Sequence, residues 1–271
     1  MNNRVDGQKA RSLVTQNALM LAAEKLIAEK GIQNVTKRAI TLAAGQKNES
    51  VLQYHFQNLE GLIDEILKVR SIQTQEKRSE LLAQLLCDTS KPTLRDICKL
   101  MVLPPYLLAR KNPDYCNYIS AFSLEPAITT DSALLLIKNK GAGGESGRET
   151  GRLLRKLLIH LDDNAYQRRI DSAIRFTSVS MNHQARAPNA FEAADADLFI
   201  NSLVDALEGI LGAPVSGETI ASARSLASEK WLWERAERTH QCLLRKLFQE
   251  PENRFIGALR IFLLNPVAHF R

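Results

Sequence analysis

The chain has 271 residues, of which 45% are hydrophobic and 24% charged, so it is long enough to bury a substantial core in one large domain or two smaller ones. Aromatic residues make up only 6%, with 13 glycines and 9 prolines, a composition that favours helices and argues against a β-sandwich. The formal net charge is +6, which is compatible with a nucleic acid or an acidic membrane as partner.

The cysteines and the hydropathy of the chain bear on its compartment. Cys87, Cys98, Cys116 and Cys242 include no C-x-x-C pair, so we expect reduced thiols packed as small hydrophobic groups, without disulfides or a zinc site. The N-terminus has no apolar signal core, and no apolar run reaches the roughly 18 residues of a membrane span. These features predict a soluble, cytoplasmic protein with no membrane partner.

Capping residues mark four helices in the first third of the chain. Gly31 and Gly45 are typical of helix C-termini, because glycine adopts the left-handed conformation without strain. Thr36 and Asn58 can cap helix N-termini with their side-chain oxygens. The expected helices cover residues 10–30, 37–44, 49–55 and 58–87.

The remainder of the chain is also expected to be helical, with two interruptions. Pro104-Pro105 should kink or break a helix over 94–111, because proline supplies no backbone donor. The glycine-rich segment 141–151 is expected to be a flexible loop. The other expected helices cover 113–124, 129–140, 151–161, 163–185, 194–211, 217–249 and 253–264. With no persistent strand pattern and no internal repeat, the predicted fold class is all-α.

Two short helices joined by a tight turn, over 36–56, are typical of a helix-turn-helix, whose second helix enters the DNA major groove. Basic side chains can neutralise phosphates, amides and hydroxyls can reach base edges, and tyrosine and histidine can bond to phosphate oxygens. The predicted DNA-binding residues are Thr36, Lys37, Arg38, Lys47, Asn48, Ser50, Gln53, Tyr54 and His55. The alternative is an ordinary solvated helix face, because short polar helices are common in helical proteins.

Four motifs follow one another in this part of the chain. They are ALMLAAEKLIAEKG at 18–31, VTKRAITLAAG at 35–45, QYHF at 53–56 and NLEGLIDEIL at 58–67. Their order resembles the N-terminal domain of the TetR family of transcriptional regulators. The resemblance implies a DNA-binding domain over 8–70 and an all-helical ligand-sensing and dimerisation domain over 71–216.

Two features depart from the family pattern and leave open which of residues 46–51 face the bases. The segment from Gly45 to Phe56 is one residue longer than is common, and Gln46-Lys47 replaces the usual small apolar residue and serine. Glu49 would repel phosphate, so it could accept a hydrogen bond from a cytosine amine, cap the third helix or point away from DNA.

The resemblance also implies that helices 163–185 and 194–211 pair with their copies from a second subunit. Each carries an apolar stripe, which could equally belong to the core of one chain. The stripes consist of Ile170, Ala173, Ile174, Thr177 and Met181, and of Leu198, Phe199, Leu203, Leu207 and Ile210. Residues 217–271 exceed the family's typical size. Their basic, amphipathic stretch 231–248 could pack on the sensing domain, form a partner surface, or contact a membrane or DNA.

No combination of residues indicates an enzyme. The segment 141–151 lacks the spacing of a phosphate-binding loop, and Ser146 does not lie in a G-x-S-x-G motif. The five histidines are not at metal-ligand spacing, so no catalytic residue, metal or cofactor is expected.

An effector pocket is expected near the two prolines, which could open a cavity between helices. Its proposed lining is Met101, Tyr106, Tyr115, Tyr118 and Phe122, although such aromatic residues could also be plain core. His160 and His183 could line the same pocket or be partly buried structural residues.

Taken together, these patterns predict a ligand-responsive repressor that binds a palindromic operator in double-stranded DNA as a homodimer. The resemblance suggests a small apolar or amphipathic effector. The alternative is a helical adaptor protein that keeps the fold without reading DNA. Glu49 favours this alternative, as does the modest charge of residues 1–70, which carry ten basic and seven acidic side chains.

Overall fold

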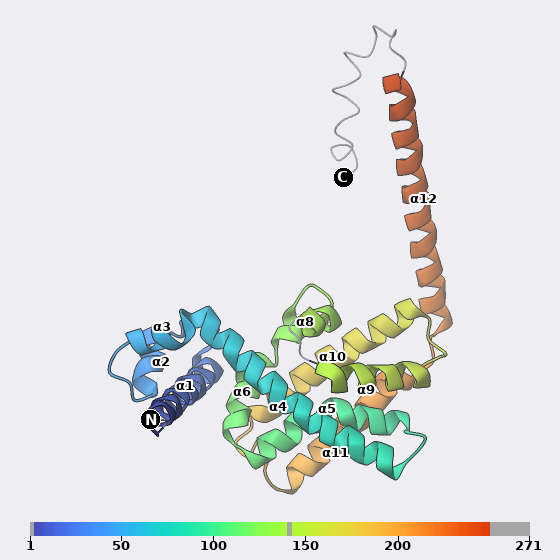
Figure 1. Cartoon of the computed structure of the whole chain (residues 1–271). Helices are drawn as coiled ribbons and strands as arrows, with labels where there is room; N and C mark the ends of the chain where they lie inside the picture. The colour runs from blue at the N-terminus through green and yellow to red at the C-terminus, as the bar shows by residue number, and fades with distance from the viewer. Residues whose placement is uncertain (1–2, 140–142, 250–271) are drawn as a thin grey trace. The chain divides into compact units, whose positions relative to one another are not determined.

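The protein is all-helical, as the sequence predicted, and the computed structural model describes residues 3–139 and 143–249 (Figure 1). No strand occurs in these two ranges. The helices are α1 (Asn3–Lys30), the 3-10 helix η1 (Ile32–Asn34), α2 (Lys37–Ala43), α3 (Ser50–Phe56), α4 (Leu59–Asp88), α5 (Leu94–Lys111), α6 (Asp114–Phe122), α7 (Glu125–Ile128), α8 (Ala133–Asn139), α9 (Gly144–Leu157), α10 (Asp163–Ala185), α11 (Ala193–Gly212) and α12 (Gly217–Gln249).

The chain divides into two compact units, residues 1–214 and 215–271. The first contains α1 to α11, and α12 is the described element of the second. The boundary expected at about residue 70, between a DNA-binding and a sensing domain, remains a prediction.

Helix ends in the N-terminal region follow the capping residues of the sequence. The Thr36 hydroxyl accepts a hydrogen bond from the Ala39 amide at 3.2 Å, and the Asn58 side chain accepts one from Gly61 at 2.8 Å. Gly31 and Gly45 adopt φ angles of 78° and 69°, in the left-handed region that glycine tolerates. These residues set the lengths of α1, α2 and the start of α4.

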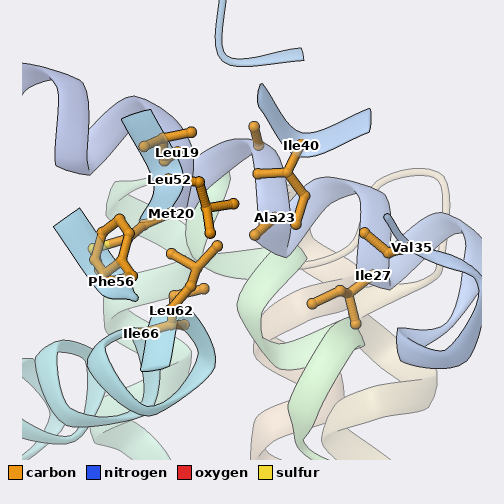
Figure 2. Close-up of a cluster of buried hydrophobic side chains, with 11 residues drawn as sticks. Leu19, Met20, Ala23, Ile27, Val35, Ile40, Leu52, Phe56, Leu62 and Ile66 are labelled. Carbon is orange, nitrogen blue, oxygen red and sulfur yellow. The ribbon is translucent and has the colours of Figure 1, made fainter. Parts of the chain in front are cut away.

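A compact apolar core holds the first four helices together, and Figure 2 shows its side chains converging. Each short helix is anchored by one or two buried apolar residues on its inner face, and the outer faces are mostly polar, with Leu42 of α2 as an exposed apolar residue. The core consists of Leu19, Met20, Ala22, Ala23 and Ile27 from α1, Val35, Ile40 from α2, Leu52 and Phe56 from α3, and Leu62 and Ile66 from α4.

The helix break expected at Pro104-Pro105 is absent, because α5 continues through both prolines. Pro104 cannot donate to the carbonyl of Leu100, one helical turn earlier. The Nε of Arg78, from α4, donates to that carbonyl instead, at 3.3 Å. A tertiary contact thus replaces the lost backbone bond.

The flexible loop expected over 141–151 is wrong for residues 144–151, since α9 begins at Gly144, and residues 141 and 142 lie outside the described residues. Glycines weaken a helix by roughly 1 kcal/mol each relative to alanine, but one face of this helix is buried by Ser146, Thr150 and Leu154. The Ser146 hydroxyl donates to the Gln75 carbonyl of α4 at 3.1 Å. Packing on α4 and α5 therefore overrides the local preference.

The predicted helices over 163–185 and 194–211 are present as α10 and α11, which pack on each other. Most of their predicted stripe residues face the interior of the same chain, as the intrachain alternative proposed. Ile170, Ala173, Met181, Leu203 and Leu207 are buried, and Ile174, Thr177, Phe199 and Ile210 are partly buried. Leu198 is exposed.

The second unit is described by its long helix α12, which carries the exposed residues Trp231 and Trp233. The helix predicted over 253–264 lies outside the described residues. Among the described residues no single helix is long and apolar enough to span a membrane, and the segments Ala194–Gly212 and Gly217–Arg235 pass that test only as a bent pair.

Candidate nucleic-acid interface

The turn between α2 and α3 is closed by backbone hydrogen bonds. The Gly45 amide donates to the Leu42 carbonyl at 3.0 Å, and the Gln46 amide donates to Thr41 at 2.9 Å. Ile40 and Leu52, both fully buried, fix the two helices on the shared core. The outer surface of α2 and α3 is thereby held in one arrangement.

Nearly all of the predicted DNA-binding residues lie on that outer surface. Tyr54 is 81% exposed, so its ring and hydroxyl are available for contact with a partner. The exposed members are Thr36, Lys37, Arg38, Lys47, Asn48, Ser50, Gln53 and Tyr54. His55 is partly buried, and its Nδ1 lies 3.3 Å from Nε2 of Gln16 in α1.

Two of these residues also shape the backbone. Thr36 caps α2, as described above, and the Asn48 side-chain oxygen accepts a hydrogen bond from the Ser50 amide at 3.0 Å. Glu49 stands at the N-cap position of α3, but its side chain makes no capping bond and is exposed. Of the three roles considered for Glu49, capping is therefore excluded.

Two of the cations on this surface lie at a helix N-terminus, where the helix macrodipole is unfavourable for positive charge. Lys37 and Arg38 occupy the first turn of α2, where the macrodipole disfavours positive charge by about 0.3–1 kcal/mol each. Within the described residues, neither these two nor Lys47 form an ion pair. An external polyanion could supply the missing negative charge.

The junction of α3 and α4 is a tight feature that the sequence patterns did not indicate. Gln57 has a positive φ of 66°, and the Asn58 amide donates to the Phe56 carbonyl at 2.7 Å. A Cβ on Gly61 would lie 2.2 Å from the same carbonyl, so only glycine fits there. Gly61, in the first turn of a helix capped by Asn58, is the sequence feature that could have indicated this tight junction.

A buried ion pair ties α1 to α4. Nε and Nη2 of Arg70 donate to the two carboxylate oxygens of Glu24 at 2.7 and 2.6 Å, with Glu24 fully buried. The Arg70 guanidinium also lies over the rings of Tyr115 and Tyr118 in α6, at 5.0 and 5.9 Å. Sequence reasoning missed Glu24 because it sits within an apolar helix face.

A cavity of about 260 Å³ lies between α4, α5, α6, α7, α8 and α10. Of the five predicted pocket residues, it brings together Tyr115, Tyr118 and Phe122. Burial raises the pKa of Tyr115, whose hydroxyl is 2.6 Å from that of Thr74.

The other predicted pocket residues lie elsewhere. Tyr106 is buried, and its hydroxyl donates to Asp197 of α11 at 2.8 Å. Met101 is not part of the cavity lining. His160 and His183 are exposed, so they are neither pocket-lining nor partly buried. Met101 and Tyr106 were predicted to line the pocket because they lie close to the prolines in sequence. That closeness does not determine which face of α5 meets the cavity.

Comparison with known proteins adds little. No protein-family model matches the chain, and no curated protein matches it. One similar solved structure is that of a protein described as a candidate transcriptional regulator from Streptomyces coelicolor A3(2). It is 18% identical, with a TM-score of 0.37, and the match covers 73% of this chain and 99% of that one. A similarity of this size establishes neither a fold nor a function for the present chain.

Proposed function

We propose that this protein is a sequence-specific, DNA-binding transcriptional regulator of the TetR type, most simply a repressor released by a ligand. The observation that carries the proposal is the outer surface of α2 and α3. It combines an exposed tyrosine, exposed amides and hydroxyls, and three cations that form no ion pair within the described residues. A rigid apolar core supports that surface.

The residue types divide the work of recognition. Lys37, Arg38 and Lys47 would bind phosphates, which supplies salt-dependent affinity. Tyr54 and His55 would donate to phosphate oxygens and set the position of α3 in the major groove.

The short polar side chains of α3 would then read the bases. Gln53 and Asn48 present amides, which pair best with adenine, and Ser50 presents an adaptable hydroxyl. The Asn48 side-chain oxygen accepts from the Ser50 amide, so its NH₂ group is the part left for DNA. Glu49, exposed and without a capping role, would suit a cytosine amine.

A homodimer would place two copies of α3 on a palindromic operator. Exposed apolar side chains on the two candidate interface helices support it: Phe176 and Val179 on α10, and Leu198 on α11. These residues are the proposed contacts, and only Leu198 among them belongs to the stripes predicted from sequence, whose other members are buried or partly buried.

The cavity is the proposed effector site, although its 260 Å³ falls slightly below the usual range of about 300–1,000 Å³. Tyr115 lines it and also contacts Arg70, whose ion-pair partner Glu24 lies in α1. A ligand that favours one arrangement of these side chains would shift the population of DNA-binding states.

The test is binding of the purified protein to DNA upstream of its own coding region, compared with an unrelated duplex. We expect a footprint on an inverted repeat that weakens steeply between about 50 and 200 mM salt. Lys47→Ala and Tyr54→Ala should each weaken binding to both duplexes, because phosphate contacts carry no sequence information, whereas Lys77→Ala, on α4 and outside the predicted DNA-binding residues, should not. Equal weak binding to both duplexes by all variants would favour the adaptor alternative.

A further inference from the structure

One wall of the cavity carries an arginine without an anionic partner. Arg78, from α4, lines the cavity and is partly buried. Its only hydrogen bond among the described residues runs from Nε to the Leu100 carbonyl. The two terminal nitrogens therefore keep donors available, and no carboxylate of the described residues lies within ion-pair distance.

Arg70, two turns earlier on the same helix, provides an internal comparison. It is more deeply buried, but both oxygens of Glu24 neutralise it. Burial lowers the pKa of the Arg78 guanidinium, and the only group that raises it is Tyr115. Partial removal of a cation from water without a counter-charge is costly, so this arginine at the cavity wall is a candidate partner for an anion.

The remaining lining indicates the rest of the ligand. Ser71, on the same helix as Arg78, also lines the cavity, and its hydroxyl can donate to an oxyanion, whereas the Thr74 hydroxyl already donates to the Arg70 carbonyl at 2.8 Å. Further lining is apolar and includes Ile119, Leu136 and Met181, from α6, α8 and α10. Glu125 also lines the cavity, and its carboxylate would repel an anion. The anionic group of a ligand would therefore lie next to Arg78.

We propose that the effector is a small amphipathic anion, whose carboxylate, sulfate or phosphate head pairs with Arg78 and whose short apolar tail fills the cavity. The fork of an arginine suits each of these heads, because they accept two parallel hydrogen bonds. The small volume limits the tail to a short chain. As an effector assignment, this inference rests on the proposed regulatory function.

The test measures ligand binding to the full chain without DNA, by calorimetry. The probes are octanoate, octyl sulfate and octyl phosphate, with octanol as the uncharged control. We expect at least one anion to bind wild-type protein about tenfold or more tighter than octanol. Arg78→Gln should remove this preference, Arg78→Lys should keep part of it, and Lys77→Gln, which removes a neighbouring charge outside the cavity, should keep all of it.

Arg78 also supports α5, so thermal unfolding of each variant is measured first, and Arg78→Lys serves if Arg78→Gln does not fold. Octanol binding as tightly as every anion, no anion binding, or an unchanged preference in the Arg78 variants would each overturn the inference. The effector role is tested separately, by adding the binding anion to the protein–operator complex. DNA affinity should fall for wild type and not for Arg78→Gln, and an unchanged wild-type affinity would overturn that role. If wild type binds no operator at all, the proposed function fails, while Arg78-dependent anion binding can still be read from calorimetry.

Discussion

Replacing Glu24 by glutamine should cost the protein about 3–5 kcal/mol of its unfolding free energy, because the change leaves a buried arginine without its counter-ion. The side chains of Glu24 and Arg70 are 0% and 7% exposed, so water cannot replace the lost partner. Two charge-assisted bonds, at 2.7 and 2.6 Å, are removed or weakened together. The loss is a large part of a typical domain stability of about 5–15 kcal/mol.

The assay is urea unfolding followed by far-UV circular dichroism, with thermal unfolding as a second measure. For a unit of this size the same loss corresponds to a fall in Tm of about 6–20 °C. The control is Glu65→Gln, which breaks the exposed pair of Glu65 with Lys68 on α4 and should cost less than about 1 kcal/mol. The double variant Glu24→Met with Arg70→Met should recover most of the stability, because it leaves no buried charge. A loss for Glu24→Gln no larger than for the control would refute the reasoning.

Three further outcomes follow from the geometry. Lys47→Ala should reduce the slope of log affinity for operator DNA against log salt by about 1, as expected for one lost phosphate contact, and an unchanged slope would place Lys47 off the DNA. Gly61→Ala should destabilise the α3–α4 junction, because its Cβ would lie 2.2 Å from a carbonyl oxygen. Gly151→Ala, whose Cβ would meet nothing within 4 Å, should stabilise α9 by about 0.5–1 kcal/mol. Equal effects of the two variants on urea unfolding would contradict this prediction. Cys98 is fully buried and its pKa is raised to about 12, so at pH 8 iodoacetamide should alkylate exposed Cys87 and leave Cys98 unmodified, which peptide mass mapping checks.

Local signals predicted the N-terminal helices well because each end is decided by one residue. Thr36 and Asn58 each cap a helix through a hydrogen bond to an amide three residues further along the chain. Gly45 ends α2 because glycine can adopt a positive φ angle. Such features are written in a few neighbouring positions, so the sequence specifies them directly.

The errors arose where a distant segment decides the outcome. Pro104 remains within a helix because Arg78, 26 positions earlier, bonds the freed carbonyl. The glycines of 144–151 are helical because Ser146 and its face are buried on α4. Tyr106 turns toward Asp197 and away from the cavity, a choice between helix faces that an aromatic at helical spacing cannot reveal.

In the candidate site, too, features set by neighbouring residues could be predicted, and features set by distant residues could not. The exposed polar residues of α2 and α3 could be predicted because they lie within one short motif. Glu24 and Arg70 could not be paired in advance, since they are 46 positions apart. Arg78 was missed because nothing local distinguishes it from the solvated charges around it on α4.

The central claim is that α2 and α3 read a DNA sequence, and selection from a random pool of DNA duplexes tests it most directly. Purified wild-type protein is compared with a variant carrying Lys37→Ala, Lys47→Ala and Tyr54→Ala, whose exposed side chains leave the core unchanged. We expect wild type to enrich an inverted repeat with half-sites one helical turn or a multiple apart, and the variant to enrich none. Recovery of no shared motif by the wild type, or of the same motif by both proteins, would contradict the claim.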